Sequence, residues 1–222
     1  MDGNKPTTGS PAFILSDNQA VTRAGIGLYI HRLFPQTTIT EANDKRMLAA
    51  SLGQTEGKAV VVLDYALSSF NSIDDLLIMQ KRFPHSFWLL FSDGLSEPFI
   101  RRISMEQSFG ILLKDSSQDE ITTALGYARR HESYFCIQVR SLLNATGEKP
   151  EPSPLTPTEK EILKLIARGK SVKEIAAERF SSTHTIITHK KNIFRKIGVC
   201  NVHEATKYAL RSGLVEIMEY YI

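Results

Sequence analysis

The sequence has few cysteines and no long apolar segment. Its 222 residues include two cysteines, Cys136 and Cys200, which are too few and too far apart in sequence for a disulfide framework or a cysteine-based metal site. No apolar run approaches the roughly 20 residues that a membrane-spanning helix needs, and residues 1–9 are polar and lack the apolar core of a signal peptide. We therefore expect a cytoplasmic protein that does not enter a membrane.

The sequence also lacks the short motifs that accompany common enzyme chemistry. It has no glycine-rich phosphate loop, no Gly-x-Ser-x-Gly turn and no close histidine pair of the zinc-protease kind. A phosphatase of the haloacid dehalogenase type needs a second Asp two residues after the first, and this chain has Ala66 two residues after Asp64. We therefore expect a binding protein and not an enzyme.

Charge and composition divide the chain in two. Residues 148–154 (EKPEPSP) are rich in proline and charge, show no apolar periodicity and are typical of a linker. Residues 154–222 hold 12 Lys and Arg against 7 Asp and Glu, whereas the rest of the chain has a net charge of −2. This basic excess suits a polyanionic partner. We predict a disordered tail at 1–11, a first domain at 12–130, a helical extension and linker at 131–153, and a second domain at 154–222.

Five short apolar runs alternate with amphipathic stretches of helical length in the first domain. The runs are Phe13–Leu15, Thr37–Thr40, Ala59–Leu63, Phe87–Phe91 and Gly110–Leu113. This alternation predicts an α/β fold, with a doubly wound five-stranded parallel sheet covered by helices on both faces. The third and fourth runs are apolar throughout, as central buried strands should be.

Polar residues follow several of these predicted strands directly. Ser16 and Asp17 follow the first strand, Asp64 the third, Ser92 the fourth and Lys114 the fifth. Because the carboxyl ends of parallel strands meet at one edge, we expect these residues to converge on one crevice. Two carboxylates can hold Mg²⁺ with water completing its shell, and the hydroxyl and ammonium groups can contact phosphoryl oxygens. This pattern predicts phosphoryl transfer to Asp64, although Asp and Ser also commonly begin loops.

The second domain begins with two short helical patterns joined by a turn. Thr156 with Glu159, and Ser171 with Glu174, have the spacing of capping boxes, and Gly169 marks the turn between the two helices. A third helix is predicted to start after Ser182 and to end at Gly198.

That third helix has two different faces. One is apolar and suits a core; it comprises Ile186, Ile193, Phe194 and Ile197. The other carries Ile187, Thr188, Lys191 and Arg195. An exposed basic face is often no more than solvated surface. Here the helix follows another after a short turn, as a recognition helix must if it is to enter a major groove about 12 Å wide.

Residues Leu155 to Leu210 resemble the DNA-binding domain of the LuxR/FixJ class of bacterial regulators. The resemblance implies a four-helix, all-α helix-turn-helix domain whose third helix reads base edges with Ile187, Thr188 and Lys191. It also implies support from cations and hydroxyls that meet the phosphates, namely Lys173, Thr183, Thr185, Lys190 and Lys196. The family often has Lys where this chain has Ile187, which cannot donate a hydrogen bond but can pack on a thymine methyl. We expect either an altered sequence preference or weakened DNA binding.

Residues Ala12 to Arg130 resemble the receiver domain of two-component response regulators, most closely at Leu63–Tyr65 and Leu112–Asp115. The order of the two domains matches the NarL/FixJ subfamily. This resemblance implies that Asp64 accepts a phosphoryl group from a sensor histidine kinase. It also implies that Mg²⁺ binds at Asp17 and Asp64, that Ser92, Lys114 and Ser16 support the site, and that the modified receiver changes dimerisation or releases the DNA-binding domain.

Two positions depart from the receiver pattern. Receivers usually carry a pair of acids after the first strand, and here Ser16 stands beside a single Asp17. They commonly have an aromatic residue three positions before the lysine, and here that position is Ile111. Two interpretations remain open: a working phosphorylation switch, or a receiver fold kept for phosphorylation-independent dimerisation or ligand sensing.

The sequence as a whole predicts a transcription regulator that binds double-stranded DNA as a homodimer, because two copies can read a palindrome one helical turn apart. An apolar helical stretch at residues 121–143 needs a partner, which is either the DNA-binding domain or a second copy of the chain. The alternative is a protein that sequesters a partner regulator without forming a tight DNA complex.

Overall fold

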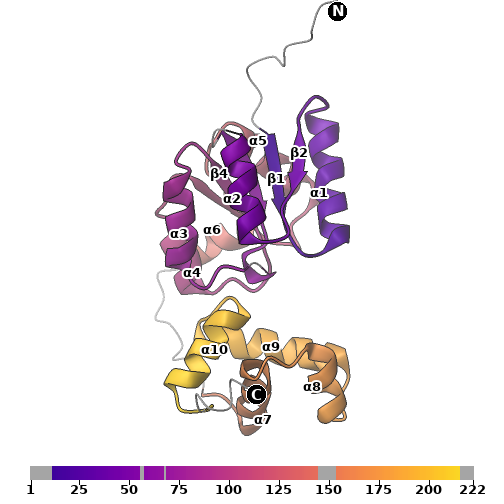
Figure 1. Cartoon of the computed structure of the whole chain (residues 1–222), viewed down its shortest axis with the longest axis vertical. Coiled ribbons are helices and arrows are strands. Elements are labelled where there is room, and N and C mark those ends of the chain that lie inside the picture. The colour runs from indigo at the N-terminus through magenta and orange to yellow at the C-terminus, as the bar shows by residue number, and fades with distance from the viewer. Residues whose placement is uncertain (1–11, 56–57, 68, 145–153, 216–222) are drawn as a thin grey trace, which may run out of the picture.

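The computed structural model describes residues 12–55, 58–67, 69–144 and 154–215 (Figure 1). They form a parallel α/β body followed by a bundle of helices. The predicted tail at 1–11, all of the predicted linker except Pro154, and the last seven residues of the predicted second domain lie outside the described residues. Within the described ranges, no helix combines the length and the apolar character that crossing a membrane requires.

Five parallel strands form one sheet in the order β2-β1-β3-β4-β5. They are β1 (Ala12–Ser16), β2 (Ile39–Glu41), β3 (Ala59–Leu63), β4 (Phe87–Phe91) and β5 (Phe109–Leu112). β3 and β4 have the predicted bounds and are buried throughout. β2 begins two residues later than predicted, because the Thr37 N–H donates to the Phe34 carbonyl and closes a turn there. The chain runs from β1 to one edge of the sheet at β2 and then, from β3 on, toward the other edge. The loops after β1 and β3 therefore lead in opposite directions and leave a crevice at the carboxyl ends of these strands.

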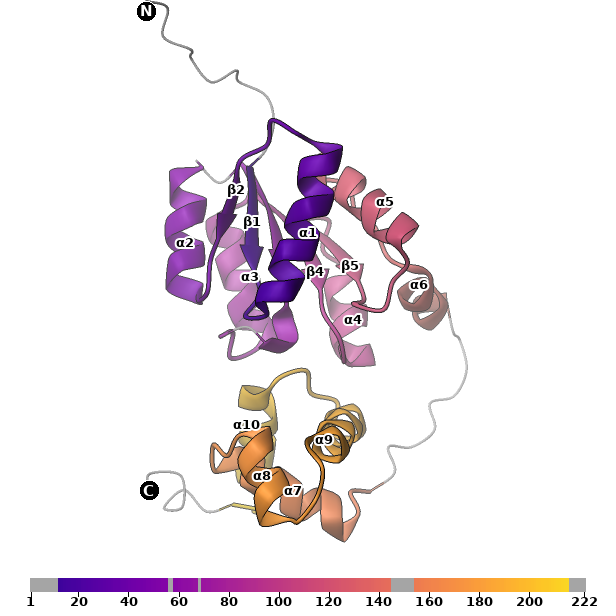
Figure 2. The same ribbon diagram turned by 90° about the vertical axis from the view of Figure 1, so that its right-hand side faces the viewer.

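Helices cover both faces of the sheet, as predicted. One face carries α1 (Ala20–Leu33) and α5 (Gln118–Arg129), and the other carries α2 (Lys45–Gln54), α3 (Ile73–Arg82) and α4 (Glu97–Ile103) (Figure 2). A short 3-10 turn, η1 (Tyr65–Leu67), follows β3. Serines start α3, α4 and α5, and each accepts a hydrogen bond from a backbone N–H three residues on. Such caps fix where each helix begins.

A further helix, α6 (Ile137–Asn144), belongs to the same body. The chain after α5 pairs with β5, since Ile111 N donates to Tyr134 O at 2.8 Å and Cys136 N donates to Ile111 O at 3.1 Å. Val139 of α6 is buried, and Arg101 of α4 donates to a carbonyl of the last turn of α6 at 3.0 Å. The apolar extension therefore packs on the receiver-like body, which is neither of the two partners considered for it, and a further contact with a second copy of the chain stays a prediction.

The second body contains the four predicted helices. They are α7 (Pro157–Ala167), α8 (Val172–Glu178), α9 (Thr183–Ile197) and α10 (Val202–Arg211). Both predicted capping boxes are present at the starts of α7 and α8. Gly198 ends α9 with a φ of 71°, a left-handed conformation that favours glycine. The carboxyl edge of the sheet faces this bundle, and the start of α10 lies against it (Figure 1).

Candidate functional site

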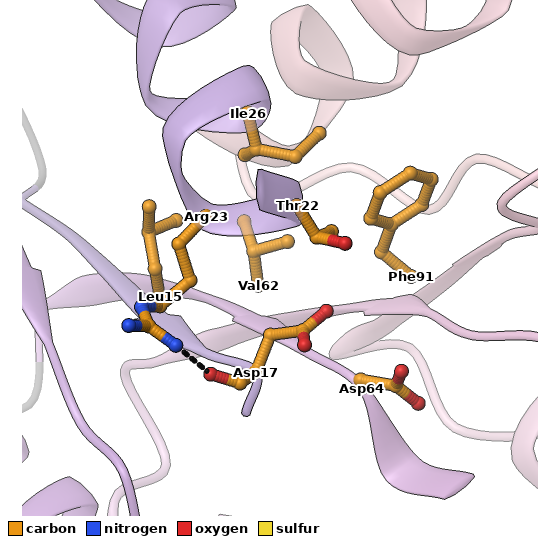
Figure 3. Close-up of a pocket in the computed structure, with 8 residues that line it drawn as sticks. All are labelled: Leu15, Asp17, Thr22, Arg23, Ile26, Val62, Asp64 and Phe91. Carbon is orange, nitrogen blue, oxygen red and sulfur yellow. Dashed lines mark hydrogen bonds between the residues drawn. The ribbon is translucent and has the colours of Figure 1, made fainter. Parts of the chain in front are cut away.

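Two carboxylates and one ammonium group meet at the carboxyl edge of the sheet. Lys114, just after β5, places its Nζ 2.9 Å from Asp17 Oδ2 and 2.5 Å from Asp64 Oδ2. Asp17 follows β1 and Asp64 follows β3, so neighbouring strands bring them together. Figure 3 shows both carboxylates at the same crevice. Three of the residues predicted to converge therefore do so.

Ser92, the fourth predicted residue, lies on the other side of Asp64. Its side chain is fully buried, and its hydroxyl donates a hydrogen bond of 2.7 Å to Asp64 Oδ1. The Ser92 hydroxyl oxygen in turn accepts a hydrogen bond of 2.6 Å from the backbone N–H of Tyr65. The Asp64 carboxylate is thus contacted by an ammonium group at one oxygen and by a hydroxyl at the other.

Burial and charge together set the protonation of this site. Asp17 and Asp64 are 9% and 3% exposed. Burial alone would lower the pKa of Lys114, but its hydrogen bonds to Asp64 and Asp17 outweigh that effect and raise the pKa above its ordinary value. Lys114 therefore stays charged and pairs with both acids, and such pairing is what buried charges require.

The residues present fit a divalent cation, with one charge fewer than in most receivers. Two carboxylates already converge on a single positive group, Lys114 Nζ, and carboxylate oxygens are the ligands that Mg²⁺ prefers. Ser16 is 8% exposed beside Asp17 and adds a hydroxyl where receivers usually have an acid. The structure gathers no cluster of three or more His, Cys, Asp and Glu side chains anywhere in the part of the chain it describes. Water would therefore complete the shell of a cation held here.

Two residues that the sequence reasoning missed also shape the site. Arg23, on α1, donates from Nη1 to Asp17 O at 2.7 Å (Figure 3). It also pairs with Glu41 at 2.7 Å. Gln19 N donates to Asp17 Oδ1 at 2.7 Å. These contacts fix the backbone and the orientation of Asp17. The sequence does show an arginine one turn into the helix that follows Asp17. Nothing in the neighbouring residues, however, indicates which groups this arginine contacts.

The crevice is small. Its volume is about 10 Å³, and its lining includes Asp17, Arg23 and Asp64 (Figure 3). A space of that size holds about one water molecule. The site therefore has room for an ion or a small inorganic group at its mouth, and not for an organic substrate within it.

The predicted reading face of α9 is exposed, and its opposite face is core. Ile187 is 43% exposed and the side chain of Lys191 is 62% exposed, with Thr188 and Arg195 beside them on the surface. The apolar face predicted as core is buried at Ile186, Ile193 and Phe194 and half-buried at Ile197. The helix therefore presents the predicted residues outward.

The side chains predicted to meet phosphates are not equivalent. Those exposed at the surface are Lys173, Thr183 and Thr185. Lys190 is half-buried with its Nζ 5.3 Å from the centre of the Phe194 ring, and burial lowers its pKa. Lys196 is held inside the domain, since its Nζ donates to Glu159 Oε2 of α7 at 2.7 Å and its side chain is 19% exposed. Lys196 thus joins α9 to α7 and is poorly placed for a phosphate.

Comparisons with known proteins agree with this arrangement. The model of a family described as "Bacterial regulatory proteins, luxR family" matches residues 153–209. The transcriptional regulatory protein MctR of Rhizobium johnstonii is 32% identical over 156 residues, which cover 70% of this chain and 73% of that protein.

The chain belongs to the LuxR-type bacterial regulators. It is a DNA-binding transcription regulator of the response-regulator type, in the NarL/FixJ subfamily.

Further relatives of this regulator extend the similarity over both bodies. The transcriptional regulatory protein LiaR of Bacillus subtilis is 28% identical over 210 residues, covering 91% of this chain and 98% of that protein. A structure of the Salmonella typhimurium response regulator RcsB has a TM-score of 0.55 at 21% identity, covering 90% of this chain and 98% of that one. This second similarity shows the shared fold. The regulator therefore has the predicted pairing of a receiver-like α/β body with a LuxR-type helical domain.

Proposed function

We propose that this regulator binds double-stranded DNA as a homodimer and that phosphorylation of Asp64 by a sensor histidine kinase controls the binding. The observation that carries the proposal is the environment of Asp64. Its buried carboxylate has a charged lysine at one oxygen and a hydroxyl at the other. These are the groups that an acyl phosphate at this position needs for its extra negative charge.

The reaction follows from the position of Asp64. A carboxylate oxygen attacks the phosphorus of a phosphohistidine, an oxygen–phosphorus bond forms, and the phosphorus–nitrogen bond breaks as the imidazole leaves and takes up a proton. Lys114 stays charged and faces the added oxygens, because its ammonium group already lies against Asp64. Mg²⁺, when held by Asp17 and Asp64, supplies further positive charge for the phosphoryl oxygens.

DNA binding is assigned to α9 and its surroundings. Ile187, Thr188 and Lys191 face the base edges in the major groove, with Arg195 one turn further along the same face. The residues assigned to phosphates are Lys173, Thr183, Thr185 and Lys190. Lys196 is left out of the set because its ammonium group pairs with Glu159. A single α9 touches few base pairs, so two copies of the chain are needed to read a long site.

The test is selection from a randomised duplex DNA pool by the intact regulator in the presence of Mg²⁺, with and without beryllofluoride as a phosphoryl mimic. We expect one sequence motif to be enriched, and enrichment to be much stronger with the mimic. An Asp64→Asn variant is the control, because it keeps the size of the side chain and removes the anionic acceptor. If the mimic acts equally on the variant, its effect does not arise at Asp64.

A second candidate function is a receiver that acts without phosphorylation, in dimerisation or ligand sensing. Ser16 in place of an acid and Ile111 in place of an aromatic favour it, since both changes remove parts of the usual switch. The same selection separates the two candidates. Equal enrichment with and without the mimic would support the second one, and no enrichment in either condition would support sequestration of a partner regulator.

A further inference from the structure

The start of α10 docks on the receiver-like body beside the candidate phosphorylation site. Tyr65, the residue after Asp64, is fully buried, and its hydroxyl donates a hydrogen bond of 2.8 Å to Glu204 Oε1 of α10. Glu204 Oε2 accepts a second hydrogen bond, of 2.8 Å, from Cys200 N. Cys200 is 2% exposed and packs in the apolar core of the receiver-like body. The first turn of α10 is therefore held by the other domain.

Further hydrogen bonds cross this contact from the same short segment. Ser96 N donates to Cys200 Sγ at 3.1 Å, and Asn201 Nδ2 donates to Phe70 O at 3.3 Å. Asn201 is also the N-cap of α10, because its Oδ1 accepts from Glu204 N at 2.9 Å. The residues that begin α10 are thus the same residues that contact the receiver-like body. A movement of the receiver surface at this contact would therefore disturb the start of α10 directly.

The Tyr65 side chain is fixed by its packing. Its ring lies 4.4 Å from the ring of Phe99 and 6.5 Å from that of Phe70, measured between centroids. Burial, together with the charge of Glu204, raises the pKa of Tyr65 far above its ordinary value. Its hydroxyl therefore stays protonated and donates a hydrogen bond to the Glu204 carboxylate, a charged acceptor.

Ser92 connects Tyr65 to Asp64. Its hydroxyl accepts from Tyr65 N at 2.6 Å and donates to Asp64 Oδ1 at 2.7 Å. A serine hydroxyl has one proton, so it cannot donate to this carboxylate oxygen and to an added phosphoryl oxygen at the same time. Since Ser92 is fully buried, the backbone N–H of Tyr65 has no water to replace it if the hydroxyl turns away.

The strand that carries the aromatic switch of other receivers offers no comparable connection. Ile111 is fully buried within β5 and has neither a ring that can swing to the surface nor a polar group. Tyr65, by contrast, connects the two domains. Its backbone N–H contacts Ser92, which is bonded to Asp64, and its hydroxyl contacts Glu204 of the DNA-binding domain.

We infer that Tyr65 transmits the state of Asp64 to the DNA-binding domain: when Ser92 turns toward a phosphoryl group on Asp64, Tyr65 loses its backbone acceptor and releases the first turn of α10. The inference deepens the proposed function and rests on it for the signal, but the docked contact itself does not depend on phosphorylation. Release also separates Lys191 of α9 from Asp93 of the receiver, which lie 3.9 Å apart in the docked arrangement.

The two cysteines of the chain make release measurable. Cys200 is buried in the core of the receiver-like body and should become accessible when α10 is released, whereas Cys136 is fully buried within the receiver-like body. The experiment measures alkylation of each cysteine by iodoacetamide with mass spectrometry, in Mg²⁺ with and without beryllofluoride. It compares the unchanged protein with Tyr65→Phe, which removes the hydroxyl and keeps the ring. Tyr127→Phe on α5, where the tyrosine is 38% exposed, is the matched control.

We expect Tyr65→Phe to raise the rate of Cys200 alkylation about tenfold without the mimic, because a hydrogen bond to a charged group contributes on the order of 1.5 kcal/mol. Beryllofluoride should raise the rate in the unchanged protein and in Tyr127→Phe, and should add little in Tyr65→Phe. Cys136 should stay protected throughout, which shows that the receiver-like body remains folded.

The other outcomes separate this inference from the proposed function. If Tyr65→Phe and the unchanged protein show the same basal rate of Cys200 alkylation and the same response to the mimic, the role of Tyr65 is overturned. The phosphorylation switch then stays intact. A raised basal rate in Tyr65→Phe with no response of any protein to the mimic supports the Tyr65 contact and contradicts phosphorylation control. No change under any condition overturns both the role of Tyr65 and release by phosphorylation, and fast alkylation of Cys200 in every protein and condition overturns the docked contact itself.

Discussion

The carboxyl edge of the sheet, here called the receiver edge, and the reading face of α9 differ in one respect. The polar groups of the first are paired with one another within the chain, and those of the second are mostly not. At the edge, Asp17, Asp64 and Lys114 are largely buried and hold one another. On α9, Ile187 and Lys191 are exposed, and the carboxylate of Asp93 that pairs with Lys191 lies 3.9 Å away. Charges taken out of water need partners, whereas side chains meant for another molecule must stay accessible. Substitutions at the edge should therefore change stability, and substitutions on α9 should change binding.

Lys114→Met should give the largest effect. It leaves two buried acids facing each other without their cation, so the free energy of unfolding should fall by about 3 kcal/mol, as when one partner of a buried pair is removed. Urea denaturation measures the loss. Lys191→Met on α9 is the matched control and should shift stability by less than about 0.5 kcal/mol. Equal losses in the two variants would contradict the contrast between the two surfaces.

Lys191→Ala should weaken specific DNA binding by about 1 to 3 kcal/mol, the usual size of a lost base contact, and leave stability unchanged. Fluorescence anisotropy with the selected duplex measures the affinity. Lys81→Ala removes the same charge from an exposed position on α3 and serves as the control. An affinity equal to that of the control would remove Lys191 from the reading face.

Lys196→Ala should behave like a substitution at the receiver edge, although Lys196 lies on α9. The hydrogen bond from Lys196 holds the pKa of Glu159 below its ordinary value of 4.5. A lowered carboxyl pKa contributes stability above the unfolded pKa, and that stability is lost as the pH falls through the folded pKa. The variant should therefore lose about 1 kcal/mol at neutral pH, and the difference should shrink in acid. Urea denaturation at neutral pH and below 4.5 tests the sign; a constant difference would exclude the ion pair as its cause.

Ile187→Lys should have the smallest effect on affinity and the clearest effect on sequence preference. A lysine at this position can donate to guanine, whereas isoleucine can only pack against a thymine methyl. Selection from the randomised pool should move one position of the motif from thymine toward guanine, with an affinity change of about 1 kcal/mol. Weak binding by the unchanged protein that the variant restores would favour sequestration of a partner.

The sequence predicted those parts of the structure that local patterns determine. β3 and β4 are apolar throughout and have the predicted bounds, and the capping boxes at Thr156 and Ser171 are formed. The convergence of Asp17, Asp64, Ser92 and Lys114 followed from strand ends in a parallel sheet.

Contacts between segments that are distant in sequence could not be predicted from the sequence. Tyr65 and Glu204 are separated by 139 positions, and neither residue stands out in its own segment. Likewise, Lys196 follows three other cations, so the sequence pattern predicts one more phosphate contact, whereas its side chain lies against Glu159 of α7. Only packing decides which of several similar lysines turns inward.

The segment before α6 has a consequence for the boundary of the receiver-like body. By pairing with Ile111, residues 134–136 cover the outer side of β5, which would otherwise be an open edge. Open strand edges act as templates on which other molecules add strands. A fragment cut at residue 130 should therefore aggregate, whereas one that continues to residue 144 should remain dispersed. The segment that leads into α6 thus protects the edge of β5 against intermolecular sheet growth.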